Sequence, residues 1–477
     1  MLGISRGSGA KLNSERVRLL KGQRAMESRP WLYMLLYVAL TSPFSATATA
    51  TEIPKRAVLA HYMVCCPKGG LSSTIQDYES EIEIAERAGI DGFVLNAGHY
   101  ARYPANLAVV ERIYEAARSH RNFGLIFSFD QSSVEESVHI IAKYANWPNT
   151  MTKDGNIVVS GWAQSAAWAK QVRQELAARG LRIFLAPQMR YSLLPQNSFL
   201  PKEYSDEKAA IAALKEAPLD GYFYFGAGSR SPEILKGIRT VAAAVHSHGK
   251  LFMCGISPFY RGLQSNARVF ESDGFSGMRD RWLEAIRSGA DWVQLVTWND
   301  WSESTYLQPF DQPLSNVWQL PNWQHLPEHG AFLRASRYYI DWFKSGRQPP
   351  IVSETLFYFY QLHPRDAEGI IDFRTMARGR PRFWDEMTDR FHLASFLQKP
   401  LSLAIRIGQH SYSLELPAGD SVTSIPLGLG SISIALSVDG RELHEELPIP
   451  VRSNADIGNF NYLSGELNVR RSIEIAH

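Results

Sequence analysis

Short apolar runs alternate with longer amphipathic stretches between residues 57 and 345. The runs are rich in β-branched and aromatic residues, whereas apolar positions in the intervening stretches recur every three or four residues, as they do on one face of a helix. Such alternation is typical of parallel strands joined by crossover helices. The expected strands cover residues 57–63, 91–97, 124–130, 157–162, 181–187, 220–226, 251–257 and 291–298, and the clearest helical stretches cover 77–88, 106–120, 165–179, 232–248 and 277–288.

Eight strand–helix repeats in about 290 residues predict a (β/α)8 TIM-like barrel over residues 51–348. A doubly wound open sheet is the alternative, but no Gly-x-Gly-x-x-Gly follows any expected strand. After Pro349-Pro350 the pattern changes to short alternating runs separated by turn residues, which is typical of an antiparallel β-sandwich. We therefore expect an α/β fold in which residues 349–477 form a supporting β-sandwich. Its expected strands cover 356–361, 390–398, 402–407, 412–416, 421–425, 431–438 and 446–451.

Residues 1–50 have the pattern of a secretory signal peptide. Ten apolar residues, 31–40, follow four basic residues between positions 18 and 29, and small residues end at Ala50, where cleavage is expected. The apolar run is short for a transmembrane helix, although an uncleaved anchor is the alternative. Met26 is a second candidate for the start, because 26–50 alone has the proportions of a signal. We expect a secreted, extracellular protein, or a periplasmic one in a Gram-negative bacterium, with no membrane partner after cleavage.

Net charge, cysteine count and aromatic content exclude few classes of binding partner. A formal net charge of +2 over 477 residues gives no reason to expect nucleic acid or an anionic membrane as a partner, and we expect a monomer. Three cysteines, Cys65, Cys66 and Cys254, do not make a disulfide framework, although one bridge to Cys254 is compatible with them. The 12 Trp and 20 Tyr residues fit both a large core and a sugar-binding cleft.

Two carboxylates stand three residues apart where the eighth expected strand ends. Asp300 and Glu303 lie among Trp298, Trp301 and Tyr306. Cleaving a glycosidic bond requires one carboxyl to protonate the departing oxygen and another to activate water or attack carbon. The same spacing fits a helix N-cap with a capping box, with the aromatic residues filling core. Position favours the first interpretation, because barrel active sites form at the C-terminal ends of strands.

Other strand ends carry residues of matching chemistry. His61 alone is more often a buried histidine than a catalyst, and Asp130 alone could cap a helix. Their shared position at the C-terminal ends favours one concave site. Asp91, Asp220 and Asp291 instead begin strands, at the opposite end, where we expect them to contribute stability. The candidates at the C-terminal ends are His61, Asn96, Asp130, Trp162 and Tyr224.

The segments around these candidate residues resemble those of glycoside hydrolase family 71, whose members are endo-acting α-1,3-glucanases, also called mutanases. The most specific phrase is Thr297-Trp298-Asn299-Asp300-Trp301-Ser302-Glu303-Ser304. The resemblance spans roughly residues 55–470. Weaker matching phrases are Ala60-His61-Tyr62-Met63-Val64 and residues 89–96, 127–130, 256–258, 417–419 and 459–462.

The resemblance implies internal cleavage of α-1,3-glucan with inversion, by two carboxylates that match Asp300 and Glu303. It adds a third carboxylate that matches Asp130, and it implies no metal and no cofactor. We expect Glu303 to be the general acid and Asp300 the base that orients water. His61 and Asn96 are expected to bind sugar hydroxyls. The expected stacking surfaces are Trp162, Tyr224, Trp298, Trp301 and Tyr306.

Two departures from the family pattern leave the exact glucan open. Members often carry an acidic residue just past the fourth strand, where this chain reads Gly161-Trp162-Ala163-Gln164. Tyr or Phe often follows the Asn-Asp pair, and here the residue is Trp301. A hydrolase of another polysaccharide on the same fold is therefore one alternative. A noncatalytic glycan-binding protein is the other, and the retention of both Asp300 and Glu303 argues against it.

Overall fold

The computed structural model describes most of the chain from residue 50 onward. The predicted signal peptide, residues 1–50, lies outside the described residues except for Ala50. The described ranges are 50–98, 102–130, 132–189, 206–263, 267–310, 325–372, 375–438, 441–454 and 457–469, together with Leu314, Val317, Trp318 and Trp323.

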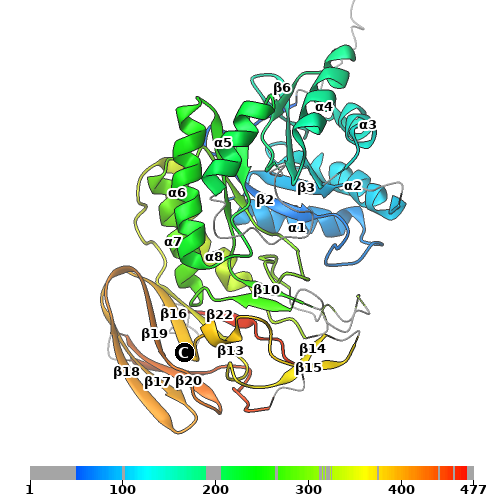
Figure 1. Ribbon diagram of the computed structural model, residues 1–477. Coiled ribbons are helices and arrows are strands. Elements are labelled where there is room, and N and C mark those ends of the chain that lie inside the picture. Colours follow the sequence, from blue (N-terminus) through cyan, green and yellow to red (C-terminus); the bar gives the residue numbers. More distant parts are fainter. Residues whose placement is uncertain are drawn as a thin grey trace, which may run out of the picture. The chain divides into compact units, whose positions relative to one another are not determined.

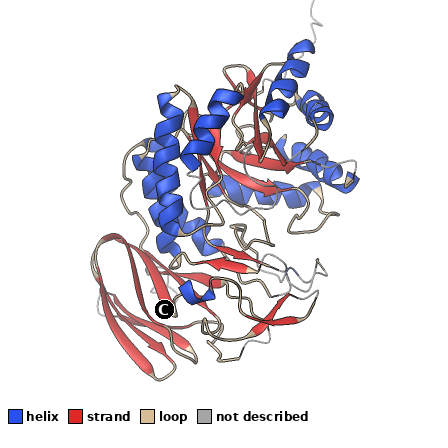
Figure 2. Ribbon diagram, in the orientation of Figure 1, coloured by secondary structure: helices blue, strands red, loops and turns tan. Residues whose placement is uncertain are grey.

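The N-terminal part is built on one sheet in which eight strands run parallel to their neighbours (Figures 1 and 2). In spatial order they are β7 (Ile183–Leu185), β6 (Asn156–Trp162), β4 (Gly124–Asp130), β3 (Gly92–Ala97), β2 (Val58–Met63), β12 (Trp292–Leu295), β9 (Leu251–Ile256) and β8 (Gly221–Tyr224). Each coincides with an expected strand. The short strands β1 (Thr51–Glu52) and β5 (Met151–Lys153) extend the sheet beyond β6. Because β12 ends at Leu295, Asp300 and Glu303 lie in the loop that follows it, whereas Asp130 is the last residue of β4.

Helices follow the strands, and their sequences explain where they form. In α1 the Thr74 hydroxyl accepts from the N–H of Asp77 in a capping box, and Tyr78, Ile82 and Ala85 form the buried face at helical spacing. Helices α3, α5 and α8 are not among the clearest helical stretches of the sequence. The helices are α1 (Ile75–Arg87), α2 (Pro104–Ala117), α3 (Val134–Tyr144), α4 (Ala166–Ala178), α5 (Asp206–Glu216), α6 (Ser231–Ser247), α7 (Phe275–Arg287) and α8 (Gly330–Ser345).

The three aspartates that begin strands tie neighbouring strands together, as the sequence predicted for that end of the sheet. Each also contacts a basic side chain. Asp91 lies 2.7 Å from the Lys344 ammonium, Asp291 lies 3.1 Å from His246 Nε2, and Asp220 pairs with Arg173. A carboxylate that accepts a backbone N–H at a strand start fixes the register of two strands at once. The carboxylates of Asp91, Asp220 and Asp291 accept the N–H of Val58, Leu185 and Phe252 at 2.8, 2.8 and 2.9 Å.

The C-terminal part contains two four-stranded antiparallel sheets that share one buried hydrophobic cluster. The expected strand over 446–451 is wrong, because β21 runs Arg441–Glu446 and ends where that strand should begin. Strands β14 (Gly369–Asp372), β15 (Ala377–Gly379) and β22 were not predicted. The first sheet is β19 (Gly419–Pro426), β16 (Arg390–Leu397), β13 (Thr355–Gln361) and β22 (Tyr462–Asn468), and the second is β18 (His410–Leu416), β17 (Leu401–Ile407), β20 (Ile432–Val438) and β21.

Two further sequence-based expectations have an outcome here. Cys65 and Cys66 are joined to each other, whereas Cys254 is free and buried, so a bridge to Cys254 is excluded. The length and apolar character that a helix needs to cross a membrane are not found in any helix of the described residues.

Candidate active site

Asp300 and Glu303 lie in the loop after β12, and residues 301–304 of that loop form a turn. No helix begins there, so the capping-box alternative is wrong. The Asp300 carboxylate does accept the Glu303 N–H at 3.1 Å, but the Asp300 N–H donates to the Thr297 hydroxyl at 2.9 Å instead of to Glu303. The aspartate therefore folds the chain back on itself and keeps both partly exposed carboxyls in one turn.

The two carboxyls influence each other's ionisation. Burial, and after it the negative charge of Glu303, raise the pKa of Asp300 to about 7, although the N–H groups of Ser302 and Glu303 oppose this. Burial also raises the pKa of Glu303, but the Tyr260 hydroxyl and the Arg268 charge stabilise its ionised form. Because like charges in one turn disfavour double ionisation, the pair retains one proton close to neutral pH.

The groups around the two carboxyls favour the protonated form of Asp300 over that of Glu303. Glu303 has a hydroxyl donor and a nearby cation, whereas the groups that oppose protonation of Asp300 are backbone N–H donors only. This order is the reverse of the sequence-based assignment, in which Glu303 carries the proton as general acid.

The loop is anchored to the segment that follows β2. Asn299 is fully buried, and its side-chain oxygen accepts the Met63 N–H at 2.7 Å while its amide donates to the carbonyls of Met63 and Cys66 at 3.1 and 2.9 Å. The Trp301 indole N–H donates to the same Cys66 carbonyl at 2.8 Å. The turn that carries Asp300 and Glu303 is thus held between β12 and β2.

Four of the predicted site residues, three for binding and the predicted third catalytic carboxylate Asp130, point to the inner side of the sheet. Side chains two or four positions apart on a strand share one side of the sheet. Leu59, Val94, Ile126 and Val158 belong to the inner hydrophobic cluster. The residues two or four positions after them, on the same side, are His61, Asn96, Asp130 and Trp162. Asp130 and Trp162 are register partners on β4 and β6, and both are partly exposed.

His61 is buried and acts through its neighbours. Its exposure is 2%, its Nδ1 lies 2.7 Å from the Gln294 amide, and its Nε2 lies 3.2 Å from the Asn96 amide. Burial lowers the pKa of His61 to about 4, so the ring is neutral at physiological pH. A neutral ring has one donor and one acceptor nitrogen, so its contacts with the amides of Gln294 and Asn96 fix these two side chains beside it.

Tyr224 was predicted one residue away from the side chain that points inward. Tyr222 and Tyr224 belong to the cluster between the sheet and the helices, whereas Phe223 belongs to the inner cluster. Since side chains alternate along a strand, Phe225 shares the inner side. Its ring centroid lies 5.9 Å from that of His61 and 6.3 Å from that of Trp162. Phe225 is a site residue that the sequence analysis missed, although period-two alternation could have found it.

Trp298, Trp301 and Tyr306 are fully buried, so they offer no face to a sugar, contrary to the expectation. The Trp298 ring packs 5.2 Å from Phe93, and its indole N–H donates to the buried Glu81 carboxylate at 3.2 Å. Trp301 and Tyr306 pack 4.9 Å apart in a separate cluster under the loop. These rings support the turn from behind.

Tyr260 is a second residue that the sequence analysis left out of the site. Its hydroxyl donates to Glu303 Oε1 at 2.8 Å. The residue follows the seventh expected strand by three positions, so its place after a strand end could be predicted, but its contact with Glu303 could not.

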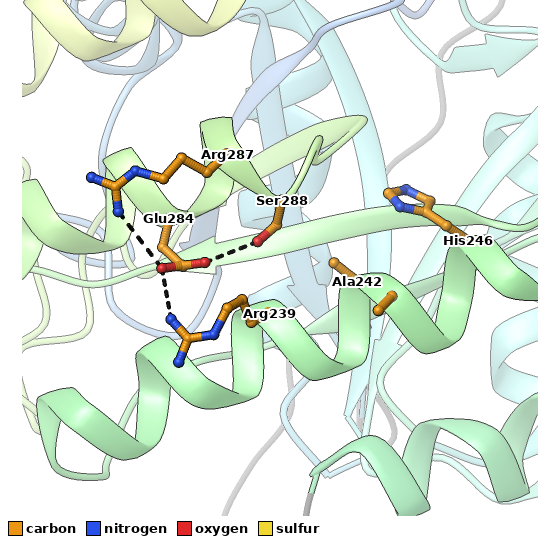
Figure 3. Close-up of a pocket in the computed structure, with 7 residues that line it drawn as sticks. Arg239, Ala242, His246, Glu284, Arg287 and Ser288 are labelled. Atoms are coloured by element: carbon orange, nitrogen blue, oxygen red, sulfur yellow. Dashed lines mark hydrogen bonds and ion pairs between the residues drawn. The ribbon is translucent and has the colours of Figure 1, made fainter.

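A groove of about 470 Å³ lies on the outer helices α6 and α7, away from these residues (Figure 3). Arg239 and Arg287 contact the one carboxylate of Glu284 at 3.0 and 3.8 Å. The groove is lined by Arg239, Ala242, Ala243, His246, Glu284, Arg287 and Ser288.

Within the described ranges, no group of three or more His, Cys, Asp or Glu side chains could hold a metal ion.

Comparison with known proteins places these features in a family context. The model of glycosyl hydrolase family 71 matches residues 54–475. A glucan endo-1,3-alpha-glucosidase of Schizosaccharomyces pombe is 26% identical over 459 residues, which cover 91% of this chain and 100% of that protein. A mutanase of Penicillium rubens is 24% identical, with 90% and 92% covered. Among solved structures, a GH99 endo-alpha-mannosidase from Bacteroides thetaiotaomicron is 15% identical, with 61% and 97% covered and a TM-score of 0.47.

Proposed function

The chain belongs to glycosyl hydrolase family 71, and from this premise we propose that it cleaves internal linkages of α-1,3-glucan with inversion at the anomeric carbon. The observation that carries the proposal is the placement of Asp300 and Glu303 in one turn after β12, where the Asp300 carboxylate accepts the Glu303 N–H at 3.1 Å and burial raises the pKa of both carboxyls. One protonated and one ionised carboxyl is the state that hydrolysis of a glycoside needs. The names of the two fungal relatives supply the substrate.

In this mechanism the protonated carboxyl gives its proton to the glycosidic oxygen as the bond to the anomeric carbon breaks. The ionised carboxylate takes a proton from a water molecule, which attacks that carbon from the opposite face. The resting proton on Asp300 favours Asp300 as the acid and Glu303 as the base. The proton on the attacking water then ends on Glu303, and exchange with solvent restores the pair.

The surrounding residues supply the binding surface. Asp130 and Trp162 are neighbours at the same sheet edge and partly exposed. We propose that the Asp130 carboxylate accepts sugar hydroxyls and that the Trp162 ring, which lies beside Phe225, stacks on a sugar face. Asn96, oriented by His61, donates to a further hydroxyl.

The finer architecture belongs to the same proposal. We propose that the eight strands close into a (β/α)8 barrel over residues 51–348. Two backbone hydrogen bonds support closure between β7 and β8, from Asp220 N to Leu185 O at 2.9 Å and from Phe223 N to Pro187 O at 3.2 Å. The two C-terminal sheets then form a β-sandwich over residues 349–477. The signal-like pattern of residues 1–50 supports secretion, in keeping with the ascus wall named for one relative.

Incubation of the purified protein with insoluble α-1,3-glucan tests the proposal. We expect release of reducing ends, with products of inverted anomeric configuration by NMR. Asp300→Asn and Glu303→Gln should each lower kcat by about 10²- to 10⁴-fold, whereas Asp154→Asn, at an exposed carboxylate, should leave kcat unchanged. Hydrolysis of only β-linked or α-1,4 glucan would refute the substrate, and full activity of both site variants would refute the site.

A substrate with an activated leaving group assigns the two roles. On an α-1,3-linked oligoglucosyl fluoride, departure of fluoride needs little protonation, so the variant that lacks the acid should keep most of its activity. The variant that lacks the base should stay slow and recover with azide, which attacks without a base. Binding to the glucan without turnover by the wild type would instead favour the noncatalytic alternative.

A further inference from the structure

A short β-hairpin follows β9 in the chain and contacts the turn that carries Asp300 and Glu303. It consists of β10 (Tyr260–Gly262) and β11 (Arg268–Phe270), which pair antiparallel between β9 and α7. The N–H of Arg261 donates to the Glu303 carbonyl at 3.0 Å, and the N–H of Leu263 donates to the Ser302 carbonyl at 2.9 Å. The hairpin therefore fixes the backbone of the turn that carries both catalytic carboxyls.

The side chains of the same hairpin reach the Glu303 carboxylate. The buried Tyr260 hydroxyl donates to Glu303 Oε1 at 2.8 Å and accepts from the Arg268 guanidinium at 3.1 Å. The guanidinium also lies over the Tyr260 ring, 5.1 Å from its centroid. Burial raises the pKa of Tyr260, so its hydroxyl stays a donor throughout the physiological range.

The other strand of the hairpin is held by the C-terminal part of the chain. The Val269 N–H donates to the Arg382 carbonyl at 3.0 Å, and the Arg382 N–H donates to the Ala267 carbonyl at 2.9 Å. The Phe270 ring stacks on Phe383 with centroids 5.4 Å apart. The hairpin that carries Tyr260 is therefore hydrogen-bonded through β10 to the turn of Asp300 and Glu303, and through β11 to the segment around Arg382.

We propose that Tyr260, held in place by Arg268, is a positioning residue that fixes the Glu303 carboxylate in one orientation through the bond to Oε1. A glutamate carboxylate on a turn has several rotamers, and a bond at one oxygen selects among them and leaves Oε2 for the reaction. The bond also favours the ionised form of Glu303. The inference rests on the proposed function, because it assigns Glu303 a part in hydrolysis.

Tyr260→Phe removes only the hydroxyl and tests the inference directly. We expect kcat on α-1,3-glucan to fall about 10- to 100-fold with KM little changed, since orientation acts on the chemical step. The acidic limb of the pH profile should move to higher pH, because Glu303 loses a donor to its charged form. Tyr412→Phe, on β18 of the C-terminal part, is the matched control and should match the wild type. An unchanged kcat and an unchanged acidic limb in Tyr260→Phe would overturn the proposal.

Arg268→Met keeps the test sharp if Tyr260→Phe folds poorly. Arg268 holds the Tyr260 hydroxyl, and its charge also stabilises the ionised form of Glu303, so its loss should lower kcat in the same direction, and the loss in the double variant should be smaller than the product of the two single losses. Multiplying effects in the double variant would overturn the role of Arg268.

A measurement without substrate separates this inference from the proposed function. NMR titration of protein labelled with carbon-13 at the glutamate carboxyls, with the Glu303 signal identified by its loss in Glu303→Gln, follows Glu303 alone. We expect its midpoint to rise in Tyr260→Phe. If the wild type ignores α-1,3-glucan while this midpoint still rises, the substrate is wrong and the role of Tyr260 stands. An unmoved midpoint overturns the role of Tyr260 whatever the substrate.

Discussion

Replacing Asp300 by Asn should stabilise the fold at neutral and alkaline pH while it removes activity. Burial and the Glu303 charge raise the pKa of Asp300 to about 7 in the folded protein, so the folded state binds this proton more tightly than the unfolded chain does. The contribution of Asp300 to stability is therefore fully present below pH about 4, falls as the pH rises, and is lost above pH about 7. The substituted asparagine stays neutral throughout and keeps a side-chain oxygen for the Glu303 N–H.

The size of the effect follows from the same shift. Moving a carboxyl pKa from its ordinary 3.8 to about 7 corresponds to about 4 kcal/mol. Since Asp300 is partly exposed, solvent screening reduces this figure, and we expect about 2 kcal/mol. At about 2.1 cal/mol/K of unfolding entropy per residue for about 430 residues, that free energy raises Tm by about 2 °C.

Calorimetric scans of wild type and Asp300→Asn between pH 4 and 9 would measure the difference in Tm. We expect almost none at pH 4, a steady rise in favour of the variant up to pH 7, and a constant difference above it. Asp154→Asn, at an exposed carboxylate, should show no such trend. A Tm difference that does not depend on pH, or a variant less stable than wild type at pH 8, would refute the account of the catalytic pair.

Three further substitutions test the structural frame. Trp301→Phe removes the 2.8 Å hydrogen bond to Cys66, and urea unfolding should show a loss of about 1 to 2 kcal/mol together with a lower kcat. Asp420→Ala removes a carboxylate on β19 that accepts from the Arg279 guanidinium of α7 at 2.8 Å and from the Tyr339 hydroxyl of α8 at 2.7 Å. Urea unfolding should show a free energy of unfolding lower by about 2 to 4 kcal/mol. Gly274→Ala combines a φ of 60° with a Cβ that would lie 2.7 Å from a neighbouring side chain, whereas Gly155→Ala has a φ of 72° and open space. The first should lower Tm several-fold more than the second, and equal losses would contradict the steric argument.

Local patterns were enough to predict the sheet. All eight parallel strands lie where the apolar runs lie, because a strand buried on both faces needs a continuous apolar run whatever its neighbours are. The aspartates at the strand starts were expected to support the fold for a similar reason: their position relative to the strand is a property of the sequence, and in the structure each accepts a backbone N–H of another strand. Asp300 and Glu303 were likewise recognisable from spacing, position and family resemblance.

The contacts around the catalytic pair depended on the packing of loops. Trp298, Trp301 and Tyr306 were predicted to stack on sugars, but the turn folds over them and buries all three. Tyr260 meets Glu303 across 43 residues of sequence, through a hairpin whose second strand bonds to residues near 382. No periodicity encodes such a meeting.

The sequence by itself determined the eight parallel strands, most helices and the family, and it singled out Asp300 and Glu303 as the proposed catalytic pair, since these follow from local propensity and from a short, specific motif. The tertiary structure decided which aromatic rings are buried, that Phe225 rather than Tyr224 shares the inner side, and that Tyr260 holds Glu303. The physical reason is that burial and hydrogen bonding of loop residues depend on segments that are distant in sequence, whereas the periodicity of strands and helices depends on neighbours along the chain.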